Sequence, residues 1–210
     1  NHVRFGSTIL LNMWSKKYSD VSYSQLSMAV PQWDVYGDRS SASPWGIAPT
    51  WSKGGDNVVG WVEANDYQKK GTDIMLNGYA EVDLFLKGLK YKLNVGVNKW
   101  TKRGYSAIIP YVFSSNSQNT ENKLSEDTDW ENQWMIENTI NYDNTFGKHT
   151  VSALIGYSSQ RDESRSFGAG RKGMADGIFV LDNGDPTTQS TSGSAWANTL
   201  VSMFARAMYS

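Results

Sequence analysis

Apolar residues occupy alternate positions in several stretches of this chain. The clearest stretch places apolar or small residues at every second position, between mainly polar neighbours: Ile74, Leu76, Gly78, Ala80, Val82, Leu84 and Leu86. After the short segment Lys87-Gly88-Leu89 the alternation resumes, with Tyr91, Leu93, Val95 and Val97 on the apolar side. Because successive side chains of a strand point to opposite faces, this pattern predicts a β-hairpin with one apolar and one polar face.

The same rule predicts six strands in all. The first covers residues 3–14, and the hairpin supplies the second and third. The fourth and fifth alternate through Trp130, Trp134, Ile136, Ile140 and Tyr142, and then through Val151, Ala153, Ile155 and Tyr157. The sixth starts near residue 199, with its apolar side formed by Val201, Met203, Ala205, Ala207 and Tyr209. No stretch shows a strong helical period, so the chain is predicted to be all-β.

Long and short connections alternate between these strands. We expect long polar connections at residues 15–72, 102–127 and 162–198, and tight turns near residues 87–89 and 144–148. Each strand is long enough to cross a membrane, which needs about 9–11 tilted residues. Long loops at one end and short turns at the other are typical of an antiparallel transmembrane β-barrel. The fold predicted is therefore about six strands of a larger barrel, with long extracellular loops and short periplasmic turns. A soluble sandwich remains the alternative.

Aromatic residues on the apolar side lie near both ends of the strands. Tyr91 and Tyr142 lie beside the short turns, whereas Trp130, Trp134 and Tyr157 lie toward the long connections. An aromatic ring with a polar edge prefers the boundary between lipid and water. These residues are therefore candidates for the lipid-interface girdle of a barrel.

Composition narrows the possible functions. The 210 residues include no cysteine, 19 glycines and 9 tryptophans, and the formal net charge is -1. Lack of cysteine excludes disulfides and thiolate chemistry within this sequence. A charge close to zero argues against nucleic-acid binding by phosphate neutralisation. Mean hydropathy is -0.52, and no apolar run approaches the length of a membrane helix.

Several segments together resemble the central barrel of SusC/RagA-type TonB-dependent outer-membrane transporters. The matching segments are Asn77-Gly78-Tyr79-Ala80-Glu81-Val82, Leu86-Lys87-Gly88-Leu89-Lys90-Tyr91, Glu137-Asn138-Thr139-Ile140-Asn141-Tyr142, Ala153-Leu154-Ile155-Gly156-Tyr157 and Ser202-Met203-Phe204-Ala205-Arg206-Ala207-Met208-Tyr209. Segment 65–69 resembles the family's approach to the second strand. Each motif is loose, but their order and spacing are specific.

The resemblance implies a multi-pass outer-membrane nutrient importer without enzymatic activity or cofactor. Such a transporter has a barrel of about 22 strands closed by a plug. It works with a SusD-like surface lipoprotein and the periplasmic TonB coupling protein, and its substrate is a glycan or a peptide. Residues 1–210 would belong to the barrel domain, as an internal fragment without plug or N-terminal domains. Six strands alone would leave unpaired edges that lipid cannot satisfy.

Two groups of residues are candidates for contacts inside or above the barrel. Trp14, Tyr79, Trp100 and Arg206 fall on the polar side of their strands and are expected to face the lumen. Four tryptophans of the first long connection are candidate recognition residues, because aromatic faces stack on sugar rings: Trp33, Trp45, Trp51 and Trp61. Packing within a folded loop, or against the lipoprotein, is the commoner role of such residues.

Other motifs favour simple structural explanations. Gly168-Ala169-Gly170-Arg171-Lys172-Gly173 spells a dinucleotide-binding pattern, but no helical pattern follows it, so we expect a flexible loop. Asp182-Asn183-Gly184-Asp185-Pro186 lacks the closing glutamate of a calcium loop and reads as a turn. His2 and His149 have no partner at metal-ligand spacing and are expected at the surface. No metal site or catalytic motif is therefore predicted.

Two other protein classes stay open at this point. A secreted or surface β-sheet module could bind carbohydrate through the loop tryptophans. It would be soluble without detergent, and its tryptophan fluorescence would respond to glycans. A small autonomous porin is a third possibility, although the last strand ends in mid-pattern.

Overall fold

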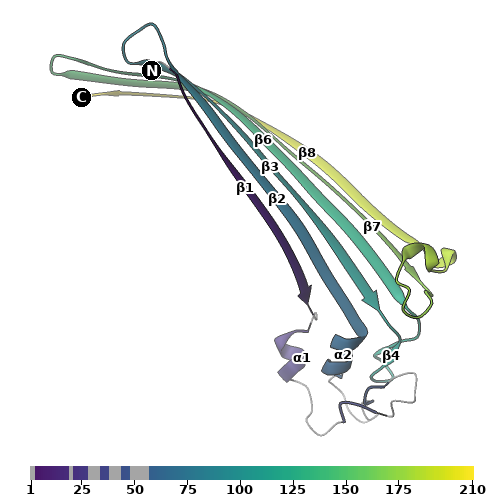
Figure 1. Ribbon diagram of the computed structural model, residues 1–210. Coiled ribbons are helices and arrows are strands. Elements are labelled where there is room, and N and C mark those ends of the chain that lie inside the picture. The colour runs from purple at the N-terminus through teal and green to yellow at the C-terminus, as the bar shows by residue number, and fades with distance from the viewer. Residues whose placement is uncertain (1–2, 19–20, 28–33, 38–43, 48–56) are drawn as a thin grey trace.

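A six-stranded antiparallel sheet forms nearly the whole of the computed structural model (Figure 1). The structure describes all residues except 1–2, 19–20, 28–33, 38–43 and 48–56. The strands are β1 (Val3–Tyr18), β2 (Asn65–Asp83), β3 (Leu89–Ile108), β6 (Lys123–Phe146), β7 (His149–Lys172) and β8 (Ser190–Tyr209). Their order in the sheet follows the sequence, so each strand pairs with its nearest strand along the chain. The predicted all-β, antiparallel fold is confirmed.

Short turns and long connections lie at opposite ends of the sheet (Figure 1). At the short-turn end, residues 84–88 join β2 to β3, and only Gly147 and Lys148 join β6 to β7. At the other end the connections carry α1 (Tyr23–Ser27), α2 (Val58–Ala64), the small pair β4 (Tyr111–Val112) and β5 (Gln118–Asn119), and the 3₁₀ turns η1 (Leu181–Asn183) and η2 (Pro186–Thr188). No helix in the described residues is long and apolar enough to cross a membrane.

The strands are much longer than the hydrophobic pattern predicts. β6 and β7 each have 24 residues, or roughly 80 Å at about 3.3 Å per residue. Segments expected as loops are strand instead: residues 15–18 continue β1, 162–172 continue β7 and 190–198 begin β8. The expected flexible loop around Gly168 and Gly170 is therefore wrong, because both glycines pair with β8. Alternation reveals a strand only where one face is apolar, and these extensions are mainly polar, with isolated apolar residues such as Phe167 and Trp196.

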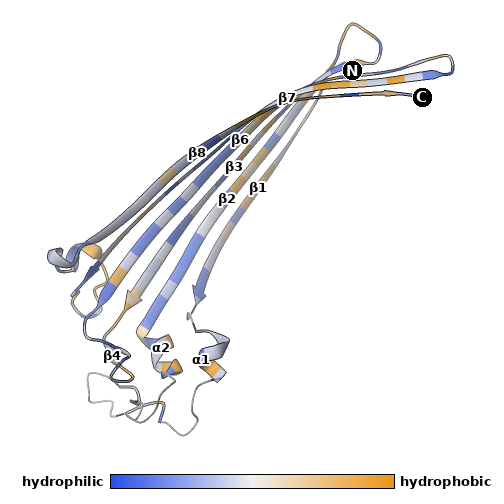
Figure 2. Ribbon diagram, turned by 180° about the vertical axis from the view of Figure 1, so that it is seen from behind, coloured by the Kyte–Doolittle hydropathy of each residue, from blue (hydrophilic) through white to orange (hydrophobic). Residues whose placement is uncertain are grey.

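Strand register brings the apolar sides of all six strands onto one face. Ile9 pairs with Leu76, which pairs with Val97, and Val97 pairs with Trp134. Across the next two strands, Ile140 pairs with Ile155, and Ile155 pairs with Ala205. Directly paired residues point to the same face of a sheet. We call this side the apolar face and the opposite side the polar face. Figure 2 shows hydrophobic and hydrophilic positions following one another along the strands.

The two short turns depend on glycines with positive φ. Gly147 has φ +64° and begins a two-residue turn, as a type II′ hairpin requires. Gly88 has φ +86°, and a Cβ there would collide with the carbonyl oxygen of Asp143 on β6. The backbone of Asp143 is also held next to Gly88 by a 2.9 Å hydrogen bond, which the Asp143 N–H donates to the Gly88 carbonyl oxygen. A Cβ at Gly147 would meet nothing within 4 Å.

Gly88→Ala should therefore destabilise the protein more than Gly147→Ala. Both substitutions force an L-residue into the left-handed region, at about 1–2 kcal/mol, but only Gly88→Ala adds a backbone collision. Urea unfolding of the full-length protein, followed by tryptophan fluorescence, measures both free energies of unfolding. Equal losses for the two variants would contradict the turn geometry described here.

Candidate functional site: the two faces of the sheet

The apolar face carries its hydrophobic residues as a band that slants across the strands. We mark its boundary on each strand by the last apolar residue before the first polar residue that the face shows beyond the middle of the sheet: Met13, Ile74, Val97, Trp134, Tyr157 and Val201. Trp130 on β6 and Phe167 on β7 are apolar residues of the same face that lie beyond this boundary. These residues are not directly opposite one another. Met13 pairs with Thr72, Ile74 with Lys99 and Trp134 with Arg161, so the boundary moves toward the short turns from β1 to β7.

A slanted boundary has a simple geometric meaning. If the boundary is a plane, strands that cross it obliquely must shift along their length from one to the next. For a tilt of about 45° and a strand spacing of about 4.8 Å, the shift is roughly 1–2 residues per strand. From Met13 to Tyr157 the boundary shifts toward the short turns by 2, 2, 0 and 4 residues, and from Tyr157 to Val201 it shifts back by 2. The net shift over the five strand pairs averages about one residue per strand, which is the slant of tilted strands that cross one flat apolar layer.

All five candidate girdle residues lie on the apolar face. Trp130 and Trp134 lie toward the long connections, whereas Tyr91 and Tyr142 lie toward the short turns. The Tyr91 hydroxyl donates to the Asn138 side chain at 2.5 Å, so its polar group is satisfied within the sheet. Tyr157 marks the apolar boundary on β7. It pairs with Asn138, which lies four residues closer to the short turns than Trp134, the boundary residue of β6.

The polar face is crossed by hydrogen bonds and ion pairs between neighbouring strands. Arg4 binds both Glu81 and Asp83 at 2.8 Å, and Lys102 binds Asp129 at 2.5 Å. The Asn94 amide donates to Glu137 at 2.9 Å. A hollow of about 180 Å³ on this face includes Met75, Asn77, Asn98, Gln133 and Gln160 among its lining residues. The face is therefore suited to contact with water or polar groups.

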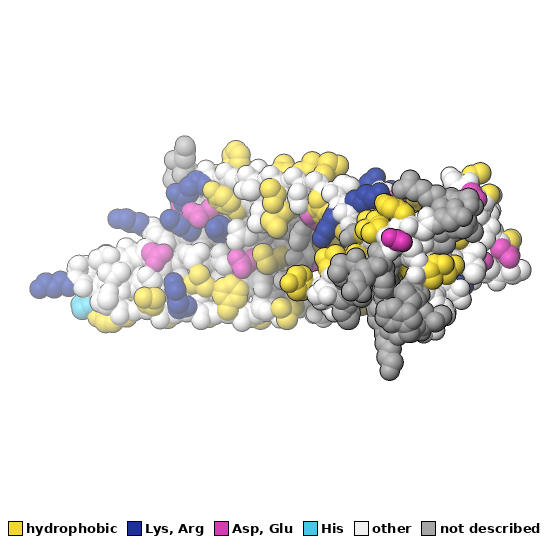
Figure 3. Space-filling view, turned by 90° about the horizontal axis from the view of Figure 1, so that it is seen from below, with side chains coloured by type: hydrophobic (Ala, Val, Ile, Leu, Met, Phe, Trp, Pro, Cys, Tyr) yellow, Lys and Arg dark blue, Asp and Glu magenta, His cyan; other side chains and the backbone are white. Residues whose placement is uncertain are grey.

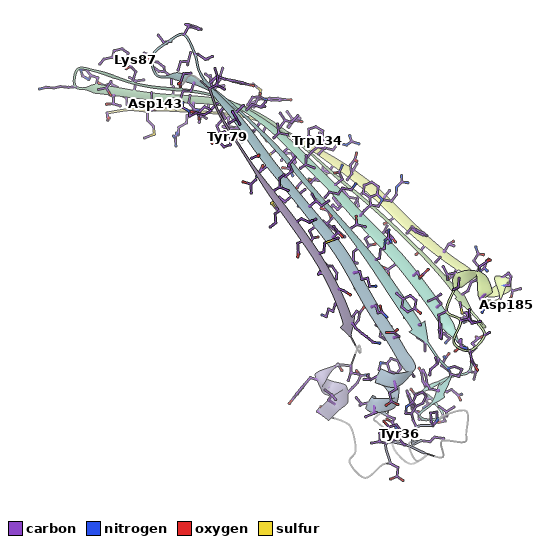
Figure 4. The ribbon with its side chains drawn as sticks, viewed as in Figure 1. Tyr36, Tyr79, Lys87, Trp134, Asp143 and Asp185 are labelled. Carbon is purple, nitrogen blue, oxygen red and sulfur yellow. The ribbon has the colours of Figure 1, made fainter. Side chains whose placement is uncertain are left out.

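All four candidate lumen residues lie on the polar face. Trp14 pairs with Gly71, and Tyr79 pairs with Gly6. Each aromatic ring occupies the space that a side chain at the paired glycine would fill, so a Cβ there would collide with the ring. Phe204 covers Gly156 in the same way, an arrangement known as aromatic rescue of glycine. Tyr79 and Trp134, labelled in Figure 4, belong to opposite faces.

Arg206 and Trp100 complete the group on the polar face. Arg206 pairs with Leu154, whereas the apolar-face residues of β8 pair with Ile155 and its neighbours of the same parity. Trp100 pairs with Asp73 and Glu131. The Lys102 ammonium lies 6.0 Å from the centre of the Trp100 ring.

Trp45, one of the recognition candidates, is buried in a small core between the first two long connections. Its side chain is 3% exposed and packs edge-on against Phe113, with ring centres 5.7 Å apart. Ala64 completes this core, and Trp61 packs against it. The Trp45 indole N–H donates to Glu63 at 2.8 Å. Trp45 is therefore buried and packs within a folded loop.

The other three loop tryptophans differ in how far the structure describes them. Trp61 is half-buried against Tyr111, and Trp33 and Trp51 lie outside the described residues. A second small core joins the third connection to the sheet through Met174, Ala107 and Leu124. Viewed from this end, hydrophobic side chains gather between the described parts of the connections (Figure 3). Sequence alternation gave no signal for these cores, because their residues lie in the connections or at the ends of strands.

The acidic turn and the visible histidine have local partners. The Asp185 carboxylate accepts the Thr187 backbone N–H and hydroxyl, each at 2.8 Å, and these bonds lower the pKa of Asp185. η1 and η2 form the turn expected at residues 182–186. His149 stacks on Tyr209, and His2 lies outside the described residues. Within the described residues, no three or more His, Cys, Asp or Glu gather as a metal site.

Comparison with solved structures finds the same fold in transporter chains. No protein-family model matches the chain, and no curated protein matches it. The structure titled "Structure of the RagAB peptide transporter" matches with a TM-score of 0.79 at 18% identity, over 100% of this chain. Two structures of the RagAB peptide importer, in "closed-closed" and "open-open" states, match 84% of this chain with TM-scores of 0.66 and 0.69, at 22% and 20% identity.

These neighbours are much longer than the present chain. The 210 residues cover 24% of the first neighbour and 18% of each of the other two. At these identities the likeness establishes the fold. It shows that this sheet, with its strand order and connections, is similar to part of a chain from a peptide transporter.

Trp45→Ala should loosen the long connections while leaving the sheet intact. Removing a buried tryptophan costs about 3–5 kcal/mol, here from a core shared by two connections. Hydrogen exchange in the full-length protein should speed up in residues 57–64 and 111–113. Trp130→Ala, which removes a tryptophan from the apolar face, is the matched control and should leave these residues protected. Unchanged exchange in Trp45→Ala would contradict this packing.

Proposed function

We propose that this chain is part of the barrel wall of an outer-membrane TonB-dependent nutrient transporter of the SusC/RagA type. Residues 1–210 contribute strands to the barrel domain, and the plug belongs to another part of a longer protein. The apolar face lies against membrane lipid, and the polar face lines the lumen. The long connections lie on the extracellular side, where the transporter meets its substrate.

One observation carries this proposal: six strands share a single apolar band whose boundary slants as tilted strands in a flat apolar layer require. A soluble sandwich would have to cover this band with a second sheet. The band is instead largely exposed, with Phe5 84%, Ile9 69%, Ile155 63% and Met203 80% exposed. The fold likeness to RagAB transporter chains supports the same interpretation.

The proposed transporter imports peptides or oligosaccharides together with a SusD-like surface lipoprotein. The likeness to a peptide transporter supports peptides as the first substrates to test. Coupling to the TonB protein would occur through parts of the longer protein outside this chain. Nothing in the proposed role requires a cofactor or a catalytic group, and the protein is proposed not to be an enzyme.

Deletion of the gene encoding the full-length protein tests this function directly. The deletion strain should lose uptake of a labelled peptide or oligosaccharide mixture, and a plasmid copy of the gene should restore it. The tagged full-length protein should be recovered from outer membranes with detergent, together with a surface lipoprotein. Recovery as a soluble protein whose tryptophan fluorescence responds to glycans would favour the carbohydrate-binding module instead.

Arginine substitutions on adjacent residues test the assignment of the two faces. Val95→Arg places a charge on the apolar face and should cost roughly 2–4 kcal/mol of folding free energy in the full-length barrel in lipid. Asn94→Arg places the same charge beside Glu137 on the polar face and should cost much less. Urea unfolding from lipid vesicles measures both values. Similar losses at the two positions would contradict the proposed faces.

A further inference from the structure

Basic residues form a row on the apolar face, just beyond the apolar boundary and toward the long connections. We call Lys17, Lys70, Lys99, Arg103, Arg161 and Arg165 the basic row. Their parity places them on the apolar face: Lys70 pairs with Arg103, Lys99 with Ile74, and Arg161 with Trp134. The row is therefore distinct from the charged network on the polar face.

The members of the basic row lie two to eight positions beyond the apolar boundary. Lys17 comes four positions after Met13, Lys70 four before Ile74, Lys99 two and Arg103 six after Val97, and Arg161 four and Arg165 eight after Tyr157. These offsets correspond to about 7–26 Å along a strand, or roughly 5–19 Å in depth for strands tilted by about 45°. The headgroup region of one leaflet is about 5–8 Å deep, so the four members nearest the boundary lie at its outer edge, and Arg103, directly opposite Lys70, has a side chain long enough to reach the same layer.

Most cations of the row have no anionic partner within the described part of the chain. Lys17 binds Asp66 at 2.9 Å, and Arg161 binds Glu163 at 2.6 Å. The other four are exposed and form no ion pair with any described residue: Lys70, Lys99, Arg103 and Arg165. Glu126 is the remaining carboxylate near them, and it also forms no ion pair with a described residue. The row therefore carries an excess of positive charge.

Lys70 and Arg103 are directly opposite each other on neighbouring strands. Like charges in this position repel, because their Cβ atoms are only about 4.5–5.5 Å apart. A hollow of about 320 Å³ opens beside them, lined also by Tyr105, with Asp66 and Glu126 farther from the apolar boundary. An anion bound between the two cations would remove their repulsion, and a guanidinium beside an ammonium suits a phosphate group.

The polar face also carries a pair of like charges on neighbouring strands. Lys16 and Lys69 are directly opposite each other. Their ammonium groups lie 5.7 and 5.3 Å from the centre of the Tyr18 ring, so the aromatic face attracts both charges. No aromatic ring within the described residues lies in this way over Lys70 or Arg103.

We propose that the basic row, centred on Lys70 and Arg103, binds the phosphate groups of an anionic glycolipid in the outer leaflet of the membrane. The inference rests on the proposed function, because it requires the apolar face to lie in lipid with the long connections outside. The phosphates of such a lipid lie at the depth of Lys70 and the other members nearest the boundary, while its acyl chains contact the adjacent apolar band. The lipid thus becomes a specific ligand of the barrel wall.

The test compares two double variants of the full-length protein in detergent micelles that contain lipid A. Lys70→Gln/Arg103→Gln removes two charges from the apolar face, and Lys16→Gln/Lys69→Gln removes two charges from the polar face of the same strands. A cation near a charged lipid surface contributes about a five-fold change in binding, so the first variant should bind lipid A about 30-fold more weakly. The control variant should bind it like the unaltered protein.

Three results would overturn the inference. Lipid A could bind the Lys70→Gln/Arg103→Gln variant as tightly as the unaltered protein, or both double variants could lose the same affinity. Inorganic phosphate alone could also stabilise the unaltered protein against heat as much as lipid A does, which would make a free anion the ligand. Failure of the proposed function gives a different result, because the protein would then be recovered without detergent.

Discussion

The ladder of backbone hydrogen bonds between strands is the constraint on which the other features depend. Side chains alternate with a period of two, so a slip of one residue in any strand would move its apolar side chains to the opposite face. Five consecutive strand pairings keep the same parity, from Val3 opposite Val82 to Tyr209 opposite Val151. One apolar face and one polar face result, and each has its own chemistry.

The direction in which the strands cross the apolar layer explains the distribution of charge on that face. Residues in one row of direct pairs, such as Ile9, Trp134 and Arg161, differ in polarity because tilted strands bring them to different depths. The basic row lies beyond the apolar boundary on the same face. In the proposed barrel wall, aliphatic side chains would meet the hydrocarbon and these cations the headgroups, while ion pairs such as that of Arg4 with Glu81 lie on the other face.

Alternation in the sequence predicted the strand number, order and faces, because each strand has a segment with one apolar side. It did not predict the strand ends: Ser164, Ser166 and Gly168 lie in a part of β7 where Phe167 is the one large apolar residue of the opposite face, too little to show a period of two. Trp45 could not be assigned as buried, since its partners Ala64 and Phe113 come from distant segments without periodic signal. The basic row also required the register, because its members are scattered singly between residues 17 and 165 and come together beyond the apolar boundary only in the sheet.

Depth and environment of the two faces are measured most directly with single cysteines, since this part of the protein contains none. A spin label at Val95, Ile136 or Ile155 in the full-length protein, reconstituted in bilayers, should be relaxed more strongly by oxygen, which dissolves in lipid. A label at Asn94, Glu137 or Ser158 should be relaxed more strongly by a water-soluble nickel complex. The account predicts this reversal between adjacent residues on β3. Equal access of the nickel complex to Val95 and Asn94 would contradict the claim that the apolar face lies in the membrane.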